Sequence, residues 1–263
     1  MPVRVKPPYE NNPNVKKPLP FFLSILLSGI VCLQEAFAGA ADYVYTPAVE
    51  YGEREIDFKF GATSPVGGNR MQGASIGYGY GAKEYWFTEV YVKQERDGSD
   101  IANMAEWENK FQLTDTGEYP VDVGLITELE APLSASSPWE FKLGPLFQTE
   151  FGKLQLNGNL LFERAFGKVD ESGVPYSTNF GYQWQAKYRW QPALEFGVQG
   201  FGDMGKWNDW DKQADQSHRI GPAVFGKFGL GDRHVIKYNA AWLVGSSDAA
   251  PDHTFRMQVE YEF

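Results

Sequence analysis

The sequence predicts an all-β protein, a closed antiparallel up-and-down transmembrane β-barrel of about twelve strands. Three observations lead to this fold class. Polar and apolar residues alternate along most of the chain, each alternating segment is about as long as a tilted membrane-crossing strand, and short and long connections follow one another in turn. Because successive side chains of a strand point to opposite faces, each strand would have one apolar and one polar face.

The chain opens with the features of a secretory signal peptide. Four basic residues precede an apolar run at 19–33, and small residues follow it in the stretch EAFAGAAD. This order predicts cleavage after Ala38 or, by the same rule, after Ala40. An uncleaved signal anchor is the alternative, but the run is short for a membrane helix, which needs about 20 apolar residues. We expect a cleaved signal peptide at 1–38 and one domain, the barrel, at 39–263.

The composition of the exported chain excludes two classes of function. Removing residues 1–38 takes away four basic and two acidic residues, so the net charge goes from −10 to −12. Lysine and arginine form no cluster, which excludes nucleic acid as a partner. The only cysteine, Cys32, lies in the leader, so disulfides and cysteine-held metals are excluded as well. We expect no cofactor and no metal.

Twelve segments share the alternation, and no segment of helical period competes with them. In AEWENKFQL the apolar residues occupy the odd-numbered positions and the charged residues the even-numbered ones. We call each such set of alternate positions a parity. The segments lie near 50–62, 72–81, 83–97, 103–114, 120–131, 138–149, 152–165, 177–190, 193–203, 217–229, 234–246 and 253–263.

The connections divide into two kinds. Short ones such as GAKE and TEFGK alternate with mostly longer polar ones such as RDGSDIAN and FGKVDESGVPYS. An even number of strands with tight turns at one end and long loops at the other is the layout of an outer-membrane barrel, with both termini at the tight-turn end. Aromatic residues gather at both predicted strand ends, as at membrane interfaces. A soluble β-sandwich is the alternative, but it does not require loops that alternate in length.

The chain ends in the alternating stretch FRMQVEYEF. With the export signal and the repeated strands, this ending resembles the Gram-negative outer-membrane β-barrel proteins, whose last aromatic strand is read by the barrel assembly machinery. The resemblance implies an outer-membrane location, contact with lipid, and an assembly signal at Tyr261 and Phe263. Residues 108–124 are similar to an uncharacterised proteobacterial family of small barrels and, more faintly, to the outer-membrane family associated with phenol degradation.

The polar parity would face the lumen, and its charges are partly segregated. Acidic residues dominate the third to seventh segments and basic residues the eighth to twelfth. A field across a narrow wet pore would select small polar or charged solutes, which predicts a porin-like passive channel. The predicted lumen residues are Glu106, Glu108, Glu128, Glu130, Glu140, Glu163, Lys187, Arg189, Lys227, Lys237 and Arg256. The first four should form one acidic patch and give a preference for cations.

Two other functions stay open. The lumen charges could pair across the pore and close the barrel as a scaffold, because twelve strands lie between the barrels that fill with side chains and those that leave a channel. A lipid hydrolase would need a nucleophile, and Ser246 lies between strands that carry His218 and His253 near their outer ends. Neither histidine has the His-x-Ser-Asn arrangement of the outer-membrane phospholipase. We therefore expect no enzyme and no catalytic residue.

Overall fold

The computed structural model describes residues 39–65, 69–133, 138–166 and 176–263. The predicted signal peptide lies outside these residues. No helix in the described part of the chain is long and apolar enough to cross a membrane.

Thirteen strands are formed by the described residues. They are β1 (Arg54–Thr63), β2 (Met71–Lys83), β3 (Trp86–Asp97), β4 (Asp100–Gln112), β5 (Asp122–Pro132), β6 (Trp139–Phe151), β7 (Leu154–Phe166), β8 (Thr178–Gln191), β9 (Leu194–Lys206), β10 (Asp209–Trp210), β11 (Ser217–Gly231), β12 (His234–Gly245) and β13 (His253–Glu262).

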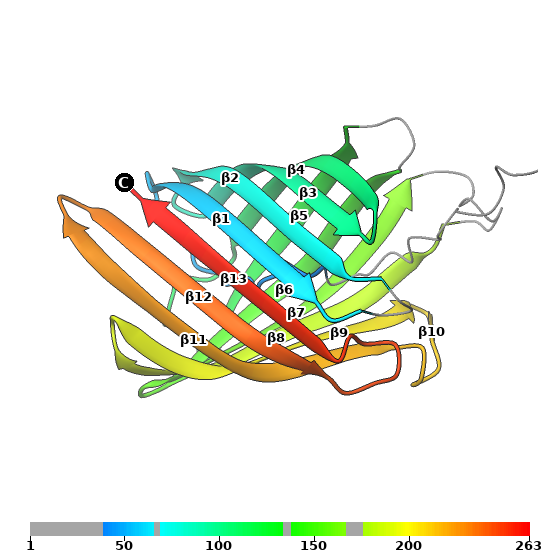
Figure 1. Ribbon diagram of the computed structural model, residues 1–263. Coiled ribbons are helices and arrows are strands. Elements are labelled where there is room, and N and C mark those ends of the chain that lie inside the picture. Colours follow the sequence, from blue (N-terminus) through cyan, green and yellow to red (C-terminus); the bar gives the residue numbers. More distant parts are fainter. Residues whose placement is uncertain (1–38, 66–68, 134–137, 167–175) are drawn as a thin grey trace, which may run out of the picture. The chain divides into compact units, whose positions relative to one another are not determined.

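Twelve of these strands close into one antiparallel barrel, which confirms the predicted fold class. Each long strand pairs with its neighbours in the chain, and β13 returns to pair with β1 (Figure 1). β10 has only two residues and pairs with β9 alone, as an extension of that strand beyond the barrel wall. Closure leaves no unpaired edge among the twelve long strands, which is the condition for strands to cross a bilayer.

The two faces of the wall are the reverse of those in a soluble protein. Large apolar side chains point outward and stay exposed; Ile76 is 56% exposed and Val92 57%. Polar side chains point inward and are buried, among them Asp57 and Lys59. An outward-facing apolar belt of this size is rare on soluble proteins and is typical of transmembrane barrels.

Aromatic rings pair at both ends of the barrel. Trp86 stacks on Phe111 at the tight-turn end, and Tyr261 stacks on Phe263 at the same end. At the other end the ring of Trp210 stacks on Phe180. Amphipathic rings at these two levels are typical of the girdles at membrane interfaces.

Two local expectations are corrected by the structure. The first strand begins at Arg54 rather than near residue 50. RDGSDIAN, expected as a loop, mostly continues β3 and β4, and only Gly98 and Ser99 remain between them; Gly98 has a φ of +58°, which suits a tight turn. The connection between β4 and β5, residues 113–121, is the longest at the tight-turn end.

Candidate functional site in the barrel lumen

Residues 39–53 run along the inside of the barrel to its tight-turn mouth, where Tyr51 is 63% exposed, and we call them the lumen segment. Gly39 lies beside the carboxylate of Glu95, near the outer end of β3. At the other end of the segment, the Val49 amide donates a 2.8 Å hydrogen bond to the side chain of Gln112, where β4 ends. The segment thus runs from the half of the lumen far from the tight turns to the tight-turn mouth, where β1 begins. The sequence analysis expects both termini at the tight turns; residue 39, the first described residue, lies at the opposite end of the segment.

Glycines on the inner face of the wall make room for the segment. A Cβ at Gly61 of β1 would overlap the carbonyl of Ala40, and a Cβ at Gly81 of β2 would overlap the carbonyl of Glu50. The wall and the segment therefore approach at backbone distance, which only glycine allows. The Gly52 amide donates a 2.8 Å hydrogen bond to the Gly81 carbonyl and fixes the lower end.

Apolar side chains of the segment alternate between opposite walls. Val44 packs with Phe201, Phe225 and Leu243, which come from β9, β11 and β12. The next residue, Tyr45, packs against one inward side chain each from β5, β6 and β7. Because both clusters are buried, the segment fills the lumen at this level in the manner of a protein core.

The second of these clusters is built from Ile126, Leu146 and Leu161, and each is at most 2% exposed. Tyr43 packs on its edge, with its ring 4.7 Å from that of Tyr45. Apolar residues on the inner face are unusual in a water-filled channel. Their burial against Tyr45 indicates that this part of the wall packs against the lumen segment.

Polar atoms of the segment are matched by the wall. The Tyr43 hydroxyl donates a 2.7 Å hydrogen bond to Glu108, and the Tyr45 hydroxyl donates to Glu128. The carbonyl of Tyr45 accepts a 3.0 Å hydrogen bond from Asn159, and its amide faces Gln183 at 3.5 Å. Matched polar contacts at both side chain and backbone specify one position for the segment.

The four glutamates of the predicted acidic patch lie together on β4 and β5. Glu106 is the direct cross-strand partner of Glu130, and Glu108 of Glu128. Lysines from the flanking strands lie among them. Lys93 of β3 contacts two of these carboxylates, and Lys142 of β6 contacts a third together with Glu163.

These lysine contacts are close. Nζ of Lys93 is 2.9 Å from Glu106 and 2.5 Å from Glu130, and Nζ of Lys142 is 2.8 Å from Glu128. The sequence analysis missed both lysines and also Lys59 of β1. Parity could have found them, because each shares the inward parity of its strand's acidic residues.

Lys59 lies at the centre of the acidic half. Its Nζ is 3.5 Å from a carboxylate oxygen of Asp57 and 3.7 Å from the ring centroids of both Tyr43 and Tyr91. A buried ammonium between two ring faces gains cation–π stabilisation as well as its ion pair. Lys59 therefore joins the lumen segment to β1 and β3.

The predicted basic residues do not form one surface. Arg256 of β13 is 1% exposed and donates to Gln199 and Asn239 in the middle of the lumen. Near the tight-turn mouth, Lys187 pairs with a glutamate of β9 and Arg189 with a glutamate of β6, while Lys227 and Lys237 lie on β11 and β12. Of these last two, Lys227 is exposed and Lys237 is ion-paired.

A belt of amide side chains runs along the inner wall from β6 to β9. Hydrogen bonds of about 3 Å link Gln148, Gln155, Asn157, Gln185 and Gln199 in one chain. The belt continues through Arg256 to the other side of the lumen. Sequence reasoning overlooked it because uncharged residues were not considered as lumen residues, although all five hold the inward parity.

Two small cavities lie beside the lumen segment in the described part of the chain. One cavity of about 30 Å³ lies between Tyr43, Tyr45 and the lysine-paired glutamates, and another of about 20 Å³ lies beside Lys142 and Glu163. Each holds roughly one water molecule. These cavities would hydrate the buried ion pairs but would not pass a solute while the segment is in place.

The residues considered for a hydrolase are engaged elsewhere. The hydroxyl of Ser246 lies 3.2 Å from the backbone carbonyl of His218 and donates to it. The two imidazole nitrogens of His218 lie 3.0 Å from the Tyr182 hydroxyl and 2.9 Å from Gln216. His253 lies with its ring beside Trp242. None of these contacts joins the Ser246 hydroxyl to either imidazole ring.

Comparisons with known proteins place this geometry among outer-membrane barrels. No family model and no curated protein sequence matches the chain. Solved structures do: the COG4313 outer membrane channel from Pseudomonas putida F1 matches with a TM-score of 0.54 and 12% identity, over 84% of this chain and 98% of that one. The fold is that of an outer-membrane β-barrel.

Two porins show the same likeness. The NanC porin matches with a TM-score of 0.52 and 10% identity, over 79% of this chain and 98% of the porin. The KdgM porin matches with a TM-score of 0.51 and 10% identity, over 80% of this chain and 99% of the porin. At these identities the likeness shows that the architecture is shared. The solute and the chemistry of the lumen have to be inferred from this chain's own residues.

Proposed function

We propose that this protein is an outer-membrane, porin-like channel for small polar or charged solutes, whose lumen is narrowed by its own residues 39–53. The channel class is supported by the barrel architecture shared with the two porins and the Pseudomonas channel. The solute class is suggested by the buried carboxylates, ammonium groups and amides of the inner wall. Such groups would replace the water molecules that hydrate a small polar solute as it passes through the lumen.

The observation that carries this proposal is the position of Tyr45 between the acidic wall and the apolar cluster of β5, β6 and β7. A ring and a hydroxyl placed in mid-lumen obstruct passage as long as the segment stays. Among the described residues, the segment is covalently joined to the barrel wall only by the peptide bond to β1 at the tight-turn mouth. Displacement of the segment would expose the lysine-paired glutamates to the pore, where they would act on passing ions.

A closed scaffold is the second candidate, and a specific observation favours it. Three of the four glutamates in the predicted acidic patch contact a lysine, and Glu108 contacts Tyr43 instead. Buried carboxylates that each have a partner in the protein need no solute to stabilise them. In that case the lumen segment and the wall would form one permanent core.

Recording from planar bilayers separates the two candidates. The protein without residues 39–48 keeps the lower anchor at Val49 and Gly52, and it is compared with the full exported chain. A channel predicts a several-fold larger unitary conductance for the shortened protein. A scaffold predicts that the full exported chain stays silent, although it shows the heat-dependent gel mobility of a folded barrel.

Partners and family follow from the same proposal. Outer-membrane lipid would cover the apolar belt, and the barrel assembly machinery would read the last strand, including Tyr261 and Phe263. The similarity of residues 108–124 to small proteobacterial barrels, and the fainter one to barrels associated with phenol degradation, supports membership in that group as a proposal. We propose no catalytic role, so lipid substrates should remain intact in the presence of the purified protein.

A further inference from the structure

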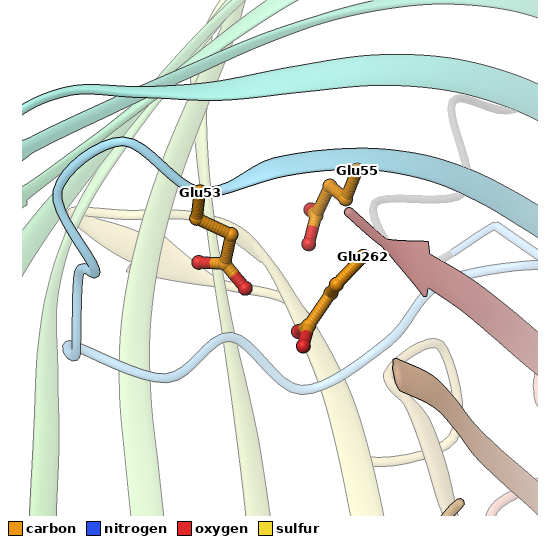
Figure 2. Close-up of side chains that lie close together, drawn as sticks. All are labelled: Glu53, Glu55 and Glu262. Atoms are coloured by element: carbon orange, nitrogen blue, oxygen red, sulfur yellow. The ribbon is translucent and has the colours of Figure 1, made fainter. Parts of the chain in front are cut away.

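We propose that Glu53, Glu55 and Glu262 form a binding site for a hard divalent cation, with Ca²⁺ as the expected ion. The three residues lie at the tight-turn mouth, where β1 meets β13. Oxygens from the three carboxylates all lie within 4.8 Å of one another. Figure 2 shows the three carboxylates turned toward the same space from the start of β1 and the end of β13.

The register of the barrel seam forces two of these charges together. Glu55 of β1 and Glu262 of β13 are direct cross-strand partners. Like charges in this arrangement destabilise a strand pair. An ion between the two carboxylates would turn this repulsion into attraction at the place where the barrel closes.

Glu55 is buried in the cluster without a partner. It is 9% exposed, and no hydrogen bond or ion pair to it is found in the described part of the chain. Lys110 and Lys237 attract it electrostatically, but neither makes an ion pair or a hydrogen bond with it in the described part of the chain. A buried carboxylate with no partner is costly, and a bound cation would remove that cost.

Lysine at this mouth does not balance the acidic charge. Nζ of Lys237 is 3.5 Å from Glu53 and 4.0 Å from Glu260, and it also contacts Glu262. One ammonium thus contacts three carboxylates, and it influences Glu55 electrostatically without contacting it. The Lys237 side chain is 42% exposed, so it can turn into the mouth when an ion arrives.

The donor set selects the kind of ion. Six carboxylate oxygens and no sulfur or imidazole suit hard cations. Ca²⁺ accepts irregular geometry and six to eight oxygen ligands, whereas Mg²⁺ requires near-octahedral geometry. Glu53 lies on the solvent side of the cluster, where water can complete the coordination.

A second glutamate cluster in the lumen provides an internal comparison. Carboxylate oxygens of Glu106, Glu108 and Glu128 also lie within 4.8 Å of one another. Each of these three carboxylates accepts from a lysine or from a tyrosine of the lumen segment. Each carboxylate of the second cluster therefore has a protein donor, which Glu55 lacks, so the ion should prefer the cluster at the mouth.

Calorimetric titration of Ca²⁺ into the full exported chain, stripped with EDTA in detergent at 0.1 M KCl, tests the site. We expect one saturable site with a dissociation constant on the order of 10⁻⁴ to 10⁻³ M, as in extracellular calcium modules. Glu55→Gln and Glu262→Gln should weaken binding at least tenfold. The matched control Glu108→Gln, in the second cluster, should leave it unchanged.

The heat-dependent gel shift gives a readout that does not depend on calorimetry. Ca²⁺ should raise the temperature at which the wild-type barrel opens, and it should have no such effect on Glu55→Gln. Should that variant fail to fold, Glu53→Gln, which lies before β1, takes its place. No saturable binding by the wild-type protein, or equal binding by the wild-type protein and the Glu55 or Glu262 variant, would overturn the proposal.

Discussion

Tyr45 of the lumen segment and Glu128 of β5 are joined by a hydrogen bond from the phenolic hydroxyl to the carboxylate, 83 residues apart in the sequence. The same carboxylate accepts from Lys142 of β6 at 2.8 Å. Glu128 is thus shared between the barrel wall and the segment inside it. Loss of either donor should change how firmly the segment is held.

The first prediction separates the volume of Tyr45 from its hydroxyl. Tyr45→Phe keeps the ring and should lower the free energy of unfolding by about 1.5–3 kcal/mol, the usual value of a hydrogen bond to a charged group. Tyr45→Ala also removes the ring and should cost about 3–5 kcal/mol. Urea unfolding in detergent measures both. Equal stabilities of the two variants would show that the ring does not pack in the lumen.

The second prediction concerns selectivity once the segment is absent. Glu106, Glu108, Glu128 and Glu130 carry four negative charges, and the two lysines that contact them carry two positive ones, which leaves −2. Replacing all four by Gln would leave +2. In the protein without residues 39–48, the reversal potential should therefore shift from cation toward anion preference, most strongly at low salt.

The opposite change provides the control for this prediction. Lys93→Gln in the shortened protein should strengthen the preference for cations, because it leaves Glu106 and Glu130 without their ammonium. Reversal potentials that do not move in either variant would show that ions pass elsewhere or do not pass at all.

The third prediction concerns the start of the exported chain. Cleavage after Ala38 would create an α-ammonium group at Gly39, beside the carboxylates of Asp42 and Glu95. The intact mass of the exported protein should correspond to a chain that begins at Gly39. Glu95→Gln should lower the stability of the folded protein, because it removes a partner of the new ammonium. A mass that begins at Ala41, or one that retains the leader, would contradict this prediction.

The fourth prediction concerns assembly. The Phe263 amide donates a 2.9 Å hydrogen bond to the carbonyl of Arg54, where the barrel closes, and its ring stacks on Tyr261. Phe263→Asp places a charge at the lipid interface and removes the terminal aromatic residue, so the amount of folded protein in the outer membrane should fall sharply. Phe263→Tyr keeps the ring and should assemble normally. Wild-type levels of the Asp variant would contradict the role of the last strand.

Alternation made the barrel wall predictable, because a strand has a period of two and only one of its faces is apolar. Asp57, Lys59 and Gly61 of β1 all hold the inward parity, as a reader of the sequence could infer. The pairing of the acidic patch could not be inferred as readily. It depends on which lysine of a neighbouring strand reaches which level of the lumen, and that is set by the register between strands.

The lumen segment was beyond prediction for a different reason. Its stretch GAADYVYTPAVEYGE keeps neither the period of a strand nor that of a helix, so local pattern gives no sign of where it lies. Its position follows from contacts with residues far along the chain, such as Asn159 and Gln183. Those contacts exist only after the barrel has closed.

The central claim, that residues 39–53 occupy the lumen, is open to a direct covalent test. A Cβ at Gly73 of β2 would lie 3.3 Å from that of Ala41, close to the separation in disulfides, and the exported chain has no cysteine of its own. A pair of Ala41→Cys with Gly158→Cys, on the outward parity of β7, is the matched control.

Oxidation of Ala41→Cys/Gly73→Cys, followed by mass spectrometry and bilayer recording, is the most direct measurement. We predict an intramolecular disulfide in the folded barrel of this pair and none in the control, together with a low conductance that rises when the disulfide is reduced. A folded double variant whose two thiols stay free after oxidation, and react with alkylating reagent as readily as those of the control, would contradict the account.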